Sequence, residues 1–475
     1  MLTGFWPPSH TEREDLSTLG ITLCTVDPED SGITMRLARF VETLEYRDLD
    51  LAVTTATKEV ILDTLGACYA GTPTGPGNRI LEYVATFDGD AAAVVGRPDS
   101  SIAHMAALAN GTTAHALDVD DGHRGASAHP GSAVIPAALA LAEKHDIDGK
   151  SLVTAVVAWY EAMVPTAVAV QTSHRERGFH ATATTGCFGA AAAASSVLQL
   201  DAREIAHALG LGGTQAGGLF EFLEKGSMAK RFHPGRAAMA GVVAAELAAS
   251  GFDGPDTIIE GSDGFATAFA DECDFSPFDR LGDLFAVTES YLKPYPCCRH
   301  IYGPIDAVLD LRANGIDPSA VTSISVETYR SAAYHDNKRI DNLLDAQMSL
   351  PYGVAVAFVT RDASLDAFDP TNAERDDVAA LMQRVSVYAT DEMEAKYPET
   401  RPATVVVETE DGKRHERLIE HPRGAAESPL TSEEVSAKFR DLSSASLDRE
   451  EPHAVIDAVL HLETKQSVSE LTALL

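Results

Sequence analysis

The chain has 475 residues, enough for two or more domains, and 45% of them are hydrophobic, which excludes wholesale disorder. It contains 37 lysines and arginines against 71 aspartates and glutamates, a formal net charge of −34. This negative charge is spread along the chain, so it argues against a nucleic-acid or membrane partner and is typical of a halophilic protein in a high-salt cytoplasm.

The N-terminal stretch, residues 1–30, is rich in proline, serine, threonine and acidic residues without periodicity, and it predicts a loose arm. It lacks the basic start and the apolar run of a signal peptide. The six cysteines include no Cys-x-x-Cys pair, which excludes zinc-ribbon spacing and favours a reducing compartment. We therefore expect a cytoplasmic protein.

Helical patterns follow this arm and continue to residue 250. Residues 186–200 are mostly small, so we expect neighbouring helices to approach one another closely there. Residues 152–170 are apolar over a length that could cross a membrane, but Glu161 and a proline interrupt them. We predict that this segment is a buried core helix.

The pattern changes near residue 275, where β-branched residues begin to alternate with polar ones. The predicted strands are residues 321–329, 385–390, 403–410 and 416–420, and the predicted helices between them are 302–313, 346–360 and 376–383. The last two strands are joined by an Asp-Gly hairpin signal. We predict a mainly α protein with an α+β second domain: a helical domain over 1–274, an α+β lid over 275–420, and a helical return over 421–475.

Ionisable side chains crowd into the segment His115–Pro136, between two apolar helices. It holds three histidines and three aspartates, and His129 is held in a restricted backbone because it precedes a proline. A histidine near an aspartate is a common solution for abstracting a proton beside a carboxylate, so Asp118 and His129 are candidate catalytic residues. Alternatively, Asp120 or Asp121 caps a helix.

Two other chemistries use the same segment. His115, Asp118, His123 and His129 are a possible ligand set for a divalent metal, although their spacing matches no standard metal motif. Residues 118–121 also form a DxDD string, as in helical terpene cyclases, but only 7% of the residues are aromatic, too few to line a carbocation pocket.

Three further segments are candidates for the same site. His180 lies at a loop-to-helix junction, from which a histidine can point at a ligand. Residues 228–241 contain Lys230, Arg231, His233 and Arg236 before a small-residue helix, which indicates an anion site; the alternative is salt bridges to the acidic surface. Residues 293–300, KPYPCCRH, are rigid and cationic, and we interpret their two cysteines as packing residues.

Taken in order, these segments resemble the MmgE/PrpD family, which includes 2-methylcitrate dehydratase, cis-aconitate decarboxylase and iminodisuccinate epimerase. The resemblance rests on HALDVDDGH, HPGSAVIPAALALAE, GFHATATTGCFGAAAAA, KRFHPGRAAMAG, KPYPCCRH and AQMSLPYGVAVAF. It implies a large all-helical domain built from both chain ends, a smaller α+β lid, a homodimer, and a site at the domain interface that needs no metal or other cofactor.

Five residues match the active-site pattern of this family: Asp118, His129, His180, Lys230 and Tyr352. The chain departs from the decarboxylase pattern at two positions, because Gly122 stands where that pattern has threonine and Cys298 where it has histidine. The turn before His129 is also one residue longer. These departures weaken a decarboxylase assignment more than they weaken family membership.

We therefore predict a lyase that dehydrates a small di- or tricarboxylate of the 2-methylcitrate type. Lys230 and Arg236, with Arg299 and His300 from the lid, are expected to hold the substrate carboxylates and stabilise the charge that builds up during elimination. His129 or His180 would take the proton, and Asp118 would orient a histidine. The alternatives are decarboxylation of cis-aconitate, epimerisation of a dicarboxylate such as iminodisuccinate, and a dimer that binds acids without converting them.

Overall fold

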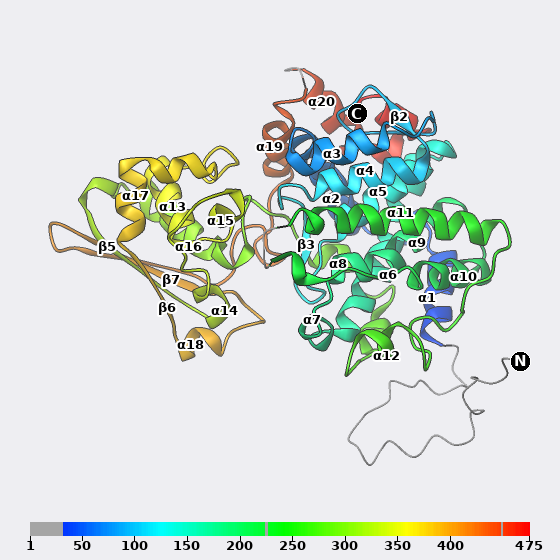
Figure 1. Ribbon diagram of the computed structural model, residues 1–475, viewed down its shortest axis with the longest axis horizontal. Coiled ribbons are helices and arrows are strands. Elements are labelled where there is room, and N and C mark those ends of the chain that lie inside the picture. Colours follow the sequence, from blue (N-terminus) through cyan, green and yellow to red (C-terminus); the bar gives the residue numbers. More distant parts are fainter. Residues whose placement is uncertain (1–31, 224–226, 448–449) are drawn as a thin grey trace, which may run out of the picture.

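The computed structural model describes residues 32–223, 227–447 and 450–475, so the loose arm predicted for residues 1–30 lies outside the described residues. Two bodies are joined side by side, a large helical one and a smaller one with a sheet (Figure 1). The structure is mainly α with an α+β part, which confirms the predicted fold class.

The helical body takes its elements from both ends of the described chain. Its α-helices are α1 (Ile33–Thr43), α2 (Leu51–Gly71), α3 (Gly75–Val84), α4 (Ala103–Ala114), α5 (Pro130–Lys144), α6 (Gly149–Val170), α7 (Ser173–Glu176), α8 (Ala181–Thr184), α9 (Gly186–Val197), α10 (Ala202–Gly213), α11 (Ala229–Ala249), α12 (Phe265–Phe269), α19 (Ser432–Ser443), α20 (Glu451–Leu460) and α21 (Ser469–Thr472). Helices α19 and α20 pack on α2, so the chain returns to this body after the sheet (Figure 1).

Short strand pairs and 3₁₀ turns connect these helices. The strands are β1 (Ala92–Ala93), paired with β2 (Ser100–Ser101), and β3 (Gly122–His123), paired with β4 (Ser290–Tyr291). The 3₁₀ helices are η2 (Tyr46–Asp48), η3 (Phe220–Leu223), η4 (Ser276–Arg280), η5 (Ala286–Glu289) and η9 (Leu462–Thr464). Through the β3–β4 pair, the segment that leads into the smaller body is fixed to the loop between α4 and α5.

Small residues allow the central helices to pack closely, as the sequence predicts. Helix α9 lies against α5, α6 and α11. A Cβ added at Gly189 would lie 1.3 Å from the Trp159 ring nitrogen, and one added at Gly241 would lie 2.2 Å from the Ala190 side chain. Helix α6 is apolar enough to cross a membrane, but 94% of its apolar window is buried inside the protein, which confirms the prediction of a core helix.

The smaller body is a four-stranded sheet with helices packed against it. Its elements are η6 (Arg299–Ile301), α13 (Tyr302–Ala313), η7 (Pro318–Ala320), β5 (Val321–Thr328), α14 (Arg330–Ala333), α15 (Leu343–Gln347), α16 (Leu350–Thr360), η8 (Pro370–Glu374), α17 (Asp376–Gln383), β6 (Val385–Ala389), α18 (Asp391–Glu394), β7 (Ala403–Thr409) and β8 (Arg414–Ile419). The strand order is β6-β5-β7-β8, with β5 parallel to β6 and the other neighbours antiparallel. Helices α13 and α16 contact the sheet.

Two details differ from the predicted boundaries. The predicted helix 346–360 is two helices, because Ser349 caps α16 by accepting a hydrogen bond from the Tyr352 backbone N–H, and Pro351 follows in its first turn. The core of the smaller body starts at Tyr295, whereas residues 285–292 contribute to the core of the helical body.

Candidate active site

A cavity of about 740 Å³ lies between the helical body and the smaller body. Six cationic side chains line it: Arg175, Lys230, Arg231, Lys293, Arg299 and Arg401. Among the described residues, Asp118 is the one carboxylate that lines it. The cavity therefore has a strongly positive lining in a chain whose net charge is −34. We call the side that carries Asp118, His129, Lys230, Arg231 and Lys293 the helical wall, and the side that carries Cys298, Arg299, His300, His335 and Arg401 the small-domain wall.

The helical wall is organised around the Asp118 carboxylate. Asp118 follows the end of α4 and has a φ of 61°, a left-handed conformation that aspartate tolerates better than most residues. Its Oδ1 lies 2.6 Å from Lys293 Nζ, and its Oδ2 lies 2.6 Å from Lys230 Nζ. Burial alone would raise the pKa of Asp118, but the charges of Lys230 and Lys293 outweigh it and hold that pKa well below its usual range.

The two lysines on this carboxylate have different acidities. Burial lowers the pKa of Lys230, although the attraction of Asp118 opposes that shift. Lys293 is also penalised by burial, but its contact with Asp118 dominates and raises its pKa above the usual value. Lys293 is therefore a fixed positive charge, and Lys230 is the more acidic of the two.

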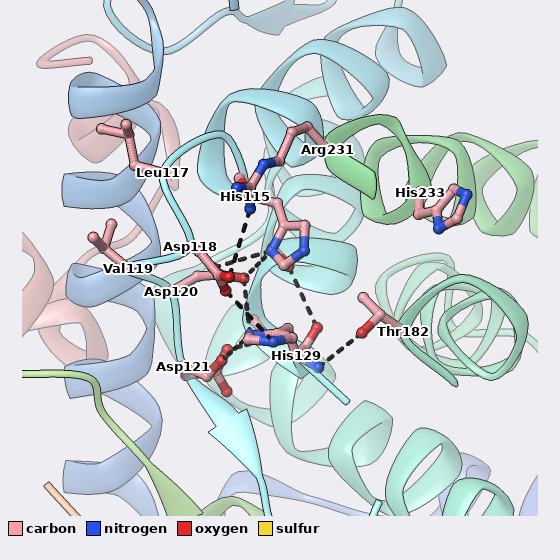
Figure 2. A network of polar contacts seen from close by, with 12 residues as sticks. His115, Leu117, Asp118, Val119, Asp120, Asp121, His129, Thr182, Arg231 and His233 are labelled. Carbon is pink, nitrogen blue, oxygen red and sulfur yellow. Dashed lines mark hydrogen bonds and ion pairs between the residues drawn. The ribbon is translucent and has the colours of Figure 1, made fainter. Parts of the chain in front are cut away.

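His129 caps α5 and is held at both its ring and its backbone. Its Nδ1 lies 2.8 Å from the Asp121 carbonyl, and its backbone N–H donates to the Thr182 hydroxyl at 3.0 Å (Figure 2). Because a carbonyl only accepts, Nδ1 carries the proton and Nε2 has the free lone pair. Burial and the nearby Lys293 charge lower the pKa of His129 to about 3, so its imidazole is neutral at pH 7.

Buried hydrogen bonds support this wall from behind. His115 Nδ1 lies 2.8 Å from Asp120 Oδ2, both side chains are fully buried, and the His115 ring meets the His129 ring edge-on at 4.7 Å (Figure 2). Asp121 accepts from the Tyr160 hydroxyl at 2.6 Å and from the Gly131 N–H at 2.7 Å, while burial raises its pKa to about 8. The loop of ionisable residues is thus packed rather than free to move.

The small-domain wall contains cationic groups without acidic partners. The Arg299 guanidinium lies 3.6 Å from the centre of the Tyr291 ring and is 6% exposed. Burial lowers the pKa of Arg299 to about 10, and its NH1 has no hydrogen-bond partner among the described residues. Arg401 likewise has an unpartnered buried Nε, and neither arginine forms an ion pair with a described carboxylate. Both donors are suited to an anionic ligand.

Neither group of close histidine, cysteine and aspartate side chains fits a metal ion well. His115, Asp118, Asp120 and His129 bring possible ligand atoms within 4.8 Å of one another, but Lys230 and Lys293 already occupy both oxygens of Asp118. Cys298, His300 and His335 are equally close, but the charges of Arg299 and Arg401 act on this group. A further cation would be repelled at both places, so the residues fit an anion better.

Five of the eight predicted site residues line the cavity: Asp118, His129, Lys230, Arg299 and His300. His180 does not, because it is buried with its Nδ1 2.9 Å from His233 Nδ1 and its ring against Phe220 and Phe222. It lies behind the aromatic side chains that line the cavity.

Arg236 and Tyr352 are also placed away from the cavity. Arg236 donates to the carbonyls of Gln215, Gly217 and Ala183, so its guanidinium holds a loop instead of a substrate. Tyr352 is fully buried in the core of the smaller body, and its hydroxyl donates to backbone carbonyls at residues 367 and 369. In the structure, both side chains have their polar groups satisfied by the protein itself.

Four basic cavity residues were not predicted to belong to the site, namely Arg175, Lys293, His335 and Arg401, and Cys298, which we had interpreted as a packing residue, lines the cavity as well. Lys293 begins the cationic KPYPCCRH segment, so the charge of this segment could have predicted that Lys293 belongs to the site. The other three basic residues lie in segments without a recognisable motif, and only the fold brings them to the cavity.

Comparisons with known proteins cover nearly the whole chain. The family model for the MmgE/PrpD N-terminal domain matches residues 35–277, and the model for the MmgE/PrpD C-terminal domain matches residues 295–464. The cis-aconitate decarboxylase-like protein oryM of Aspergillus oryzae is 28% identical over 96% of this chain and 99% of that protein. The cis-aconitate decarboxylase of Aspergillus terreus is 26% identical over 94% of this chain and 96% of its own, and the human one is 26% identical over 94% of each.

Proposed function

This chain belongs to the MmgE/PrpD family, and we propose that it is a lyase that removes water from a small hydroxy acid with two or three carboxylates, of the 2-methylcitrate type. The observation that carries this proposal is the charge of the cavity. Among the described residues, six cations and one carboxylate line a space of about 740 Å³, which suits a small substrate with two or three negative charges.

Elimination of water needs a carbon acid to lose its proton. A carboxylate held by Arg299 and Arg401 has its charge neutralised, which makes the neighbouring C–H bond more acidic. His129 Nε2 carries a lone pair on the helical wall and takes this proton. The electron pair of the C–H bond then forms the double bond as the hydroxyl on the adjacent carbon leaves with its own bonding pair and is protonated to water.

Asp118 has a positioning role in this scheme. It holds the ammonium groups of Lys230 and Lys293 at 2.6 Å each and so fixes two positive charges beside His129. These charges stabilise the negative charge that develops on the substrate, and Lys230 also faces the cavity to hold a second carboxylate.

Decarboxylation of cis-aconitate is the second candidate, because the full-length relatives carry that name. That reaction needs a proton donor for carbon but no base to remove a C–H proton. The neutral His129 therefore favours elimination. Gly122 also differs from the decarboxylase pattern: a Cβ there would lie 2.3 Å from the Tyr291 ring, so threonine does not fit beside Tyr291 in its present position.

Proton nuclear magnetic resonance separates these reactions. 2-Methylcitrate, cis-aconitate and iminodisuccinate are each incubated with the protein in high salt, and the signals of water loss, carbon dioxide loss and deuterium exchange are followed. We expect an olefinic product from 2-methylcitrate. Loss of carbon dioxide from cis-aconitate instead would establish the second candidate, exchange alone would indicate an epimerase, and no change in any acid would contradict a lyase of this class.

Matched variants connect the activity to the cavity. His129→Ala and Lys230→Ala are each expected to lower turnover by a factor of about 100 or more. Lys58→Ala is the control, because Lys58 pairs with Glu463 at 3.0 Å outside the cavity. Turnover in Lys230→Ala equal to that in Lys58→Ala would contradict the placement of the active site.

A further inference from the structure

We propose that Cys298 and His335 form a second proton-transfer pair, on the small-domain wall, and that this pair protonates the hydroxyl group as it leaves the substrate. The inference rests on the proposed function, because it supplies the acid that elimination requires in addition to His129. It assigns a catalytic role to two side chains that the sequence analysis did not place in the site.

The geometry fixes both side chains toward each other and toward the cavity. Cys298 Sγ lies 3.7 Å from His335 Nε2, and both residues line the cavity. His335 Nδ1 lies 3.2 Å from the Met348 carbonyl, and since a carbonyl only accepts, Nδ1 carries a proton. The Cys298 backbone N–H donates to the Gln347 carbonyl at 2.8 Å, which fixes the cysteine at the start of η6.

One further proton is then shared between Sγ and Nε2. Burial would raise the pKa of Cys298, but the hydrogen bond and charge of His335 outweigh it and lower that pKa. Burial would likewise lower the pKa of His335, but Cys298 raises it. A thiolate–imidazolium pair is the form that these opposite shifts favour.

The groups around this pair favour the loss of its proton over the gain of another. The titratable and charged residues that surround it are His300, whose ring stacks on that of His335 at 5.6 Å, with Cys297, Arg299, Arg401, Tyr329, Tyr334 and, from the helical wall, Asp118. Two permanent cations lie among them. A pair that donates its proton becomes negative and is stabilised by these cations, whereas a pair that accepts one becomes positive and is repelled.

The other free cysteines show that this environment is specific. Cys68, Cys187 and Cys297 are fully buried and do not line the cavity. Burial raises the pKa of each of them, that of Cys68 to about 12. Of these four thiols, Cys298 alone has a histidine partner and a lowered pKa.

The complete step is balanced within the cavity. His129 Nε2 takes the proton from carbon, and the electron pair of that C–H bond becomes the double bond. The C–O bond breaks, the oxygen keeps its electron pair, and the proton shared by Cys298 and His335 moves to this oxygen, so water leaves. The pair then regains a proton from solvent while His129 loses one.

Alkylation tests the pair without any substrate. Wild type, Cys298→Ala and His335→Gln are treated with iodoacetamide between pH 5 and 9, and labelling is located by peptide mapping. An ordinary cysteine thiol is about 1% ionised at pH 6.5. We therefore expect iodoacetamide to react with Cys298 at least about ten times faster than with an ordinary cysteine at this pH. His335→Gln should return its rate to the ordinary pH profile. A wild-type profile like that of a free thiol, unchanged in His335→Gln, would overturn the pair.

A substrate analogue tests the role as an acid. Where 2-methylcitrate is turned over by wild type, Cys298→Ala and His335→Gln should each lower kcat about 100-fold or more. An analogue with chloride in place of the hydroxyl needs no protonation to leave, so both variants should turn it over at nearly the wild-type rate. Full activity of Cys298→Ala on the hydroxy acid, or equal losses on both substrates, would overturn the acid role.

These two tests also separate this inference from the proposed function. If wild type converts none of the acids, the lyase proposal fails, while the alkylation profile still supports or overturns the thiolate–imidazolium pair. Thermal unfolding of each variant identifies one that has lost its fold. In that case Cys298→Ser, which keeps the side-chain volume, replaces Cys298→Ala, and His335→Asn replaces His335→Gln.

Discussion

The two walls of the cavity handle charge in different ways. On the helical wall, Asp118 lies between Lys230 and Lys293 at 2.6 Å from each, so positive and negative charges satisfy one another. On the small-domain wall, Arg299 and Arg401 form no ion pair with any carboxylate of the described chain, and each has a buried nitrogen without a hydrogen-bond partner. The charges of the helical wall are thus paired within the protein, whereas the two arginines of the other wall have no carboxylate partner among the described residues.

We infer from this difference that the paired charges of the helical wall and the unpaired arginines of the small-domain wall have different roles. Groups that are already paired are held in place before a ligand arrives, and this preorganisation suits the proton acceptor His129 and its supporting charges. Unpaired arginines gain most from an incoming carboxylate, since their desolvation is offset only when the ligand binds. Substitutions on the helical wall should therefore affect stability and turnover together, whereas substitutions of Arg299 and Arg401 should affect mainly substrate binding.

The largest effect is expected from Asp118→Ala. It leaves two partly or fully buried ammonium groups without their counter-charge, which typically costs about 3–5 kcal/mol of the free energy of unfolding. Chemical denaturation in high salt measures this loss, and turnover should fall with it. Asp118→Asn keeps the volume and one acceptor oxygen, so it should lose less stability. An Asp118→Ala protein as stable as wild type would show that the helical wall does not depend on this ion pair.

A smaller and different effect is expected from Arg299→Ala. Loss of a hydrogen bond to a charged group weakens binding by about 1.5–3 kcal/mol, so KM should rise about 10- to 100-fold with little change in stability. Arg236→Ala is the matched control, because Arg236 is bound to three backbone carbonyls away from the cavity. It should lose stability but keep its KM. The reverse pattern in these two variants would contradict the division between the walls.

The pH dependence of turnover tests the two walls separately. The pKa of His129 is lowered to about 3, so the base stays unprotonated and active down to low pH. The pKa of His335 is raised, so the proton that it shares with Cys298 is still bound at the pH where an ordinary histidine has lost its own. This proton is lost as the pH rises through the raised pKa of His335. We expect kcat/KM to fall on the alkaline side in wild type. His335→Gln should abolish this alkaline limb, and an unchanged limb would contradict its origin.

The smallest effect is expected from Tyr352→Phe. Its hydroxyl donates to two backbone carbonyls in the core of the smaller body, so its removal should cost about 1 kcal/mol of stability. Because Tyr352 does not line the cavity, kcat and KM should stay at wild-type values. A large loss of kcat would place Tyr352 in the catalytic machinery after all.

Much of the fold could be predicted from patterns that are local in the chain. The alternation of β-branched residues located β5, β6 and β7 to within one residue. The apolar run of α6 and the small residues of α9 predicted buried, closely packed helices. These features are encoded by neighbouring residues, which is why the sequence alone reveals them.

The site was only partly predictable, for a physical reason. Asp118, His129 and Lys230 lie in segments with unusual numbers of ionisable residues, and crowded charge is visible in a sequence. Arg401 and His335 lie in segments without a recognisable motif, and only the fold brings them to the cavity. The sequence also does not reveal where a side chain points. Arg236 and Tyr352 lie in segments that resemble the family, yet their polar groups donate to backbone carbonyls away from the cavity.

The most direct test of the lyase in this cavity is the initial rate of 2-methylcitrate consumption, followed by proton nuclear magnetic resonance in high salt. Wild type, His129→Ala and the double variant Arg299→Ala with Arg401→Ala are compared at the same protein concentration. We expect an olefinic acid from wild type, almost none from His129→Ala, and product from the double variant only at much higher substrate concentration. No olefin from wild type, or equal rates in all three proteins, would contradict the assignment.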